Sequence, residues 1–65
     1  MLELEQALLR EQFQTLLAQE KQALTAYTEL LQKVTDAQVR EQILQLQREK
    51  ERHVDLAERL LEIVS

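Results

Sequence analysis

The sequence predicts an all-α fold, an antiparallel two-helix hairpin that dimerises into a four-helix bundle. Its 65 residues include no Gly and no Pro, and Leu, Glu and Gln, all good helix formers, are its commonest residues. Apolar residues recur at alternating spacings of three and four in both halves, which is typical of amphipathic helices. The apolar stripes of the two halves are out of phase, which indicates a break between them. Residues 1–65 are therefore expected to form a single helical hairpin.

The first helix is expected to run from about residue 3 to residue 33. Lys33 would lie in its last turn, where the helix dipole favours a positive charge. Leu17, Leu24 and Leu31 repeat every seven residues beside the main apolar seam and widen it. The residues of this main seam are Leu2, Leu9, Phe13, Leu16, Ala23, Tyr27, Leu30 and Val34.

The turn is expected at about residues 34–36. Thr35 and Gln38 fit the N-cap and N3 positions of a capping box, and Val34 and Val39 fit the hydrophobic staple around it. Along one continuous helix, the five-residue step between these valines would rotate the apolar face by roughly 140°. A break is therefore favoured. Because no Gly marks the end of the first helix, a single long coiled-coil helix is the alternative.

The second helix is expected from about residue 36 to residue 64, with Asp36 in its first turn. Its main seam consists of Val39, Ile43, Leu46, Ala57, Leu60 and Val64. Further apolar residues widen this face, namely Val54, Leu56, Leu61 and Ile63. A two-helix hairpin covers only one stripe per helix, so these wide faces need a partner. A homo-oligomer, most simply a dimer, is expected.

Three polar residues interrupt the two seams: Glu20, Lys50 and His53. Glu20 and Lys50 lie equally far from a turn centred near residue 35, so we expect them to face each other, with His53 about one turn away. Charges inside a bundle are tolerated when they are paired or bound to a metal. One interpretation is an ion pair with a hydrogen-bonded histidine, which fixes register and partner orientation. The other is a metal site for iron or manganese.

Two segments carry a resemblance to a known family. The segment Glu20–Tyr27 resembles the first ligand helix of rubrerythrins and related ferritin-like proteins, which have a ligand Glu followed by a small residue and often a Tyr. The segment Arg48–His53 is similar to their second ligand helix, which is built around Glu-x-x-His. From about Leu16 onward, the chain looks like one half of a ferritin-like bundle. Encapsulated ferritins, whose two-helix subunits complete a di-iron site across a dimer interface, are similar in architecture.

The resemblance implies metal ligands at Glu20 and His53, with Glu49 as a substitute for the missing carboxylate, and a ferroxidase-like or peroxidase-like activity if such a site were intact. The sequence departs from the family at Lys50, which stands where the motif has Glu. A protonated Lys supplies no ligand and repels a cation. The implied site is therefore degenerate, and no catalytic residue is assigned. Tyr27, beside this polar layer, is expected to pack in the core seam.

Charge and composition narrow the possible functions. The formal net charge of −4 argues against nucleic-acid binding, which needs a basic face. No apolar run approaches the roughly 20 residues that span a membrane, and the start does not look like a signal peptide, so a cytoplasmic protein is expected. The lack of Cys excludes disulfides and thiolate metal sites. Most of the scattered basic residues, such as Arg10, Lys21, Arg40, Arg52 and Arg59, are expected on solvent faces.

Overall fold

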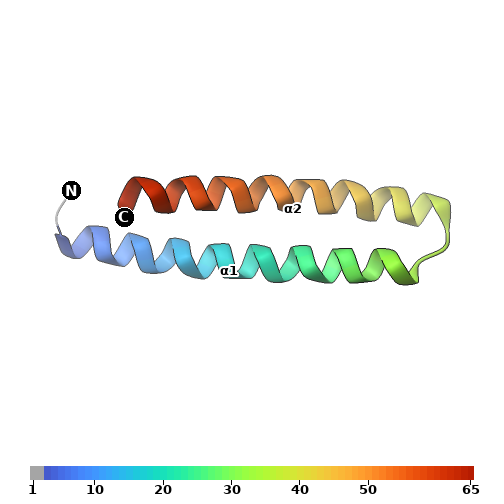
Figure 1. Ribbon diagram of the computed structural model, residues 1–65, viewed down its shortest axis with the longest axis horizontal. Helices are drawn as coiled ribbons and strands as arrows, with labels where there is room; N and C mark the ends of the chain where they lie inside the picture. Colours follow the sequence, from blue (N-terminus) through green and yellow to red (C-terminus); the bar gives the residue numbers. More distant parts are fainter. Residues whose placement is uncertain (1–2) are drawn as a thin grey trace.

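The computed structural model describes residues 3–65, and this part of the chain is a helical hairpin (Figure 1). Helix α1 spans Glu3–Lys33 and helix α2 spans Ala37–Val64. The helices run antiparallel, side by side, and the chain ends beside the beginning of α1. The expected two-helix hairpin is confirmed, and the alternative of one long helix is wrong. Neither helix is long and apolar enough to cross a membrane.

The turn differs from the predicted capping box. Asp36, and not Thr35, is the N-cap of α2: its backbone is extended, and its Oδ1 accepts a hydrogen bond of 3.0 Å from the backbone N–H of Val39. A carboxylate at this position both accepts the bond and interacts favourably with the helix dipole, which explains why the aspartate prevails over the threonine. Gln38 and Val39 therefore occupy the N2 and N3 positions, and the predicted capping box and hydrophobic staple are wrong.

Arg40 closes the end of α1 in place of a glycine. Its Nη1 donates to the carbonyls of Leu31 and Val34, the latter at 2.9 Å. Carbonyls at the end of a helix lack partners within the helix, so they need such a donor. No residue in the range 3–65 has a positive φ, so α1 ends without a left-handed cap. A guanidinium from α2 instead ties the end of α1 across the turn.

The open end of the hairpin has a similar arrangement. Gln6 Nε2 donates to the carbonyl of Val64 at 2.6 Å, and Arg10 Nη2 lies 3.5 Å from the same oxygen. Each helix therefore has its last turn capped by polar side chains of the other helix. The expectation of solvent-facing basic residues holds for the exposed Lys21, Arg52 and Arg59 but is wrong for the partly buried Arg10 and Arg40.

The inner face of α1 keeps most of the predicted seam, since five of its residues are partly buried: Leu9, Phe13, Ala23, Tyr27 and Val34. It differs at two leucines. Leu31 is buried, and Leu17 and Leu24 are partly buried, whereas Leu16 and Leu30 are exposed. Each exposed leucine is adjacent in sequence to an inner one, and a single neighbouring helix covers only one of the two. The leucines expected to flank the seam therefore pack against α2 together with most of the seam. Leu2 of the predicted seam lies outside the described residues.

Helix α2 also keeps most of its predicted seam. Ile43, Ala57 and Val64 of the predicted seam are buried, but Val39 and Leu46 are exposed. Together with Leu31, these three are the only buried apolar side chains in residues 3–65. The Cα atoms extend over 51 × 14 × 11 Å, so the hairpin is a single layer of two helices. Each helix has one neighbour, and much apolar surface stays uncovered.

Candidate functional site

Glu20 of α1 contacts Lys50 and His53 of α2 near the middle of the hairpin. Lys50 Nζ and His53 Nδ1 each lie 3.2 Å from the same atom, Glu20 Oε2. The Glu20 side chain is 16% exposed and that of Lys50 25%, while His53 is about half exposed. We call Glu20, Lys50 and His53 the polar layer. The structure thus brings together the three residues that interrupt the two seams.

The ion pair stabilises the charged form of Glu20. The hydrogen bond from Lys50 lowers the pKa of the Glu20 carboxyl from its usual 4.5. Partial burial acts in the opposite direction, while the charge of Lys50 and the contact with His53 lower this pKa further. Glu20 is therefore ionised at neutral pH, and its charge is balanced by that of Lys50.

We expect acid to weaken the protein partly through Glu20. Its pKa is lower in the folded state than in the unfolded chain, so its contribution to stability is present above pH 4.5 and is lost as the pH falls through the folded-state pKa. Urea unfolding at pH 6 and pH 3 measures the loss, and Glu20→Gln is the control because it cannot titrate. The wild type should lose more stability than the variant between these pH values. Equal losses would mean that the ion pair adds no pH-dependent stability.

Two further residues from the sequence interpretation lie away from these contacts. Glu49 is on α2, four residues before His53, and is partly buried. Tyr27 is on the inner side of α1, two helical turns from Glu20, and is also partly buried. Its hydroxyl makes no hydrogen bond within residues 3–65, which agrees with a packing role.

A metal ion would find few ligands on one hairpin. Glu20 and His53 are two possible donors, but residues 3–65 contain no group of three His, Cys, Asp or Glu side chains that could hold a metal. Lys50 has no lone pair to offer when protonated, and its ammonium already contacts the Glu20 oxygen that a cation would use. The donor set of a single chain therefore does not fit iron or manganese, which take more oxygen and nitrogen ligands.

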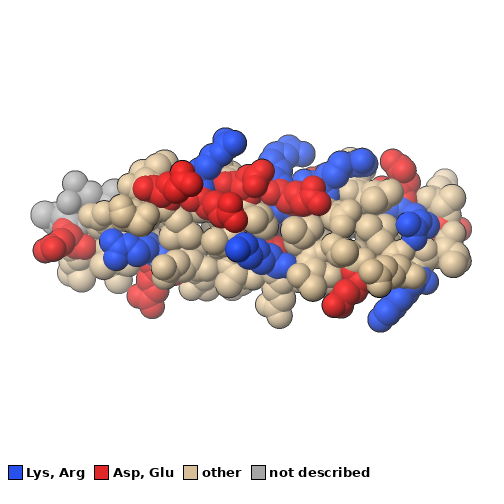
Figure 2. All heavy atoms as spheres, in the orientation of Figure 1, with Lys and Arg blue, Asp and Glu red and all other residues tan. Residues whose placement is uncertain are grey.

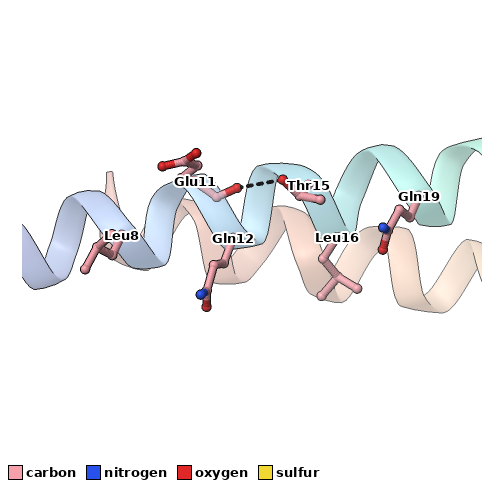
Figure 3. Close-up of a pocket in the computed structure, with 6 residues that line it drawn as sticks. All are labelled: Leu8, Glu11, Gln12, Thr15, Leu16 and Gln19. Atoms are coloured by element: carbon pink, nitrogen blue, oxygen red, sulfur yellow. Dashed lines mark hydrogen bonds between the residues drawn. The ribbon is translucent and has the colours of Figure 1, made fainter.

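An open groove of about 220 Å³ lies beside the polar layer, and both helices line it. Its walls are formed by Leu16, Glu20, His53, Leu56, Ala57 and Leu60. Four of these six residues are apolar, so the groove is suited to an apolar side chain. A wider hollow of about 410 Å³ runs along α1 alone, where Leu8, Gln12 and Leu16 project from the same side of the helix (Figure 3). It has walls from only one helix and is a shallow surface feature.

Six of the eight large apolar side chains that are exposed lie on the side of the hairpin that holds the groove. We call them the leucine face: Leu16, Leu30, Val39, Leu46, Leu56 and Ile63. Residues that immediately precede an inner position, as Leu16 precedes Leu17, project to the same side of both helices in an antiparallel pair. The groove confirms this placement, because Leu16 of α1 and Leu56 of α2 line it together. Leu56 and Ile63 were expected on a wide face that needs a partner. The other four residues of the leucine face were expected inside the hairpin.

Charged side chains lie on the other side of the hairpin. Lys21, which follows Glu20 and therefore projects to the other side of α1, lies with its Nζ 3.9 Å from Glu58 Oε1. Both side chains are about half exposed, so this pair contributes little to stability. In Figure 2, acidic and basic side chains gather along α2 on the face that is shown.

Comparison with family models, curated proteins and solved structures found no match for this chain. The resemblance to ferritin-like proteins therefore rests on the segments Glu20–Tyr27 and Arg48–His53, and the function has to be argued from the geometry.

Proposed function

We propose that this protein is a non-catalytic assembly module, a helical hairpin that pairs with a second copy to complete a four-helix bundle. The leucine face is the observation that carries the proposal. It lies on one side of the hairpin, with three apolar residues on each side of the polar layer, and no residue in the described part of the chain covers it. Large exposed apolar patches on soluble proteins usually mark sites of interaction.

The exposed area supports a partner of about the same size. The hairpin has 5193 Å² of solvent-accessible surface. A compact protein of its mass, 7.7 kDa, exposes about 4300 Å². The excess of about 900 Å² is close to the roughly 800 Å² that each partner buries in a standard protein interface. A second hairpin therefore offers enough surface to convert this single layer into a bundle with an enclosed core.

In the proposed dimer the polar layer fixes register. Glu20 and Lys50 neutralise each other within one hairpin, so a second copy can cover them without burying an unpaired charge. A second hairpin displaced along the helices would set leucines against these charges, and its association would weaken. Polar residues inside coiled coils select register in the same way. The likeness to ferritin-like proteins is then one of architecture, half of a four-helix bundle.

The mass in solution tests this proposal. At micromolar concentration we expect sedimentation equilibrium to give twice the chain mass of 7.7 kDa, because the hairpin alone encloses too little apolar surface. A folded monomer at these concentrations would overturn the proposal.

Metal loading of the same sample separates assembly from a ferritin-like metal site. Because Lys50 occupies the carboxylate of Glu20, we expect no stoichiometric Fe(II) or Mn(II) to remain after anaerobic loading and desalting. Retention of about one ion or more per dimer, lost in Glu20→Ala, would instead support a site in which Glu20, His53 and Glu49 of two copies act as ligands.

A further inference from the structure

We infer that the second copy docks on the leucine face with its turn at the opposite end, related by a two-fold axis that crosses the polar layer at right angles to the helices. This inference rests on the proposed self-association and names its geometry. A homodimer interface pairs the same surface of both copies. Face-to-face docking then leaves two choices: both turns at the same end, or turns at opposite ends.

The position of the polar layer permits docking with turns at opposite ends. Glu20 lies two residues from the midpoint of α1, and Lys50 and His53 lie within three residues of the midpoint of α2. At 1.5 Å per residue, all three are within about 5 Å of the centre of their helices. An axis through this centre superimposes the polar layers of the two copies. If the polar layer lay nearer to one end of the hairpin, docking with turns at opposite ends would set the polar layer of each copy against leucines of the other.

The apolar residues that α2 contributes to the leucine face are distributed to match such an axis. Leu30, Val39 and Leu46 lie on the turn side of the polar layer, and Leu16, Leu56 and Ile63 lie on the open side. On α2, Val39 and Ile63 lie equally far from residue 51, and so do Leu46 and Leu56. With turns at opposite ends, Val39 of one copy therefore faces Ile63 of the other, and Leu46 faces Leu56. Each copy therefore covers both halves of the leucine face of the other.

Charge distinguishes the two choices. The half that contains the turn, residues 19–51, has six acidic and five basic residues, a net charge of −1. The open half, residues 1–18 and 52–65, has six acidic and three basic residues, a net charge of −3. Docking with both turns at one end would set the two −3 halves side by side, at a separation of about one Debye length. Docking with turns at opposite ends sets each −3 half against a −1 half, so the repulsion is smaller.

Cross-linking between cysteine variants tests this geometry, and the chain has no native Cys to interfere. Val39 lies near the turn on α2 and Ile63 near the open end, so we expect their side chains to meet across a dimer with opposed turns. With both turns at one end, Val39 would instead face Leu30 of the second copy. Val39→Cys is therefore refolded with Ile63→Cys or, as the matched control, with Leu30→Cys, and each mixture is treated with a short bismaleimide.

We expect the mixed product of Val39→Cys with Ile63→Cys to exceed that of Val39→Cys with Leu30→Cys by at least tenfold in mass spectra. The reverse ratio would overturn the inference in favour of turns at one end. Dimers that give neither product would show that a different face is used, and would leave the proposed self-association standing. If the wild type and the variants all sediment as monomers before cross-linking, the proposed self-association itself is refuted.

Discussion

Leu56→Glu is expected to turn the proposed dimer into a monomer, whereas Leu8→Glu is expected to leave that dimer intact. The two leucines are 54% and 53% exposed in the hairpin, and both lie inside helices, so the substitutions are matched in helix propensity and in exposure. Leu56 belongs to the leucine face and lines its groove. Leu8 lies about 80° around α1 from Leu16 and lines only the hollow on α1, not the groove between the helices. Pairing would bury the new carboxylate of Leu56→Glu in each copy without a partner, which is strongly unfavourable.

We expect the dissociation constant to rise more than 100-fold for Leu56→Glu, a loss on the order of 3 kcal/mol. For Leu8→Glu the change should be less than about threefold, since surface substitutions rarely shift a free energy by more than about 0.5 kcal/mol. Sedimentation over a range of concentrations measures both constants. Equal effects of the two variants would show that the leucine face is not the interface.

Arg40→Met is expected to lower the free energy of unfolding by about 2–3 kcal/mol, because hydrogen bonds that involve a charged group contribute this much. The guanidinium donates to two carbonyls at the end of α1, and no other residue in the described range donates to them from a side chain. Methionine keeps most of the aliphatic packing of the arginine, so the variant isolates the loss of these bonds.

Arg48→Met is the matched control for this effect. Arg48 is on the same helix but mostly exposed, and its only ion pair within residues 3–65 is with Glu41 at 3.9 Å. Such pairs contribute little, so the change should be within about 0.5 kcal/mol. Urea unfolding at one fixed protein concentration compares the variants, since the stability of a dimer depends on concentration. Similar losses for both arginines would mean that the cap on α1 has no special role.

The fold could be predicted because its signals are local. The absence of Gly and Pro allows long helices, and the change of phase between Val34 and Val39 places the turn. Once an antiparallel hairpin is expected, counting residues from the turn is enough to bring Glu20 opposite Lys50. The contacts of the polar layer could therefore be predicted from the sequence. Metal binding by its residues stays a prediction, and pairing with a second copy stays a proposal.

Most of the predicted seam residues lie on the inner side, but which of two neighbouring leucines faces inward could not be predicted in the same way. Both stripes on α1 are rich in leucine, and they lie only one residue apart. The inner side of α1 also contains Gln6 and Arg10, and the inner side of α2 contains Arg40 and Gln47. Polarity alone would place these four residues on the solvent side. These polar residues are accommodated because each finds a partner on the opposite helix, as Gln47 Nε2 does at 2.9 Å from Thr28 Oγ1. Such pairings depend on three-dimensional contacts that periodicity does not contain.

The caps at the two ends and the ion pair between them also prevent the helices from sliding past each other. Arg40 holds the turn end, Glu20 and Lys50 hold the middle, and Gln6 holds the carbonyl of Val64 at the open end. A shift of one helix by a single turn, 5.4 Å, would break all three attachments at once. The hairpin therefore behaves as a rod of constant length, and any protein fused to its open end would be kept at a defined distance from the turn.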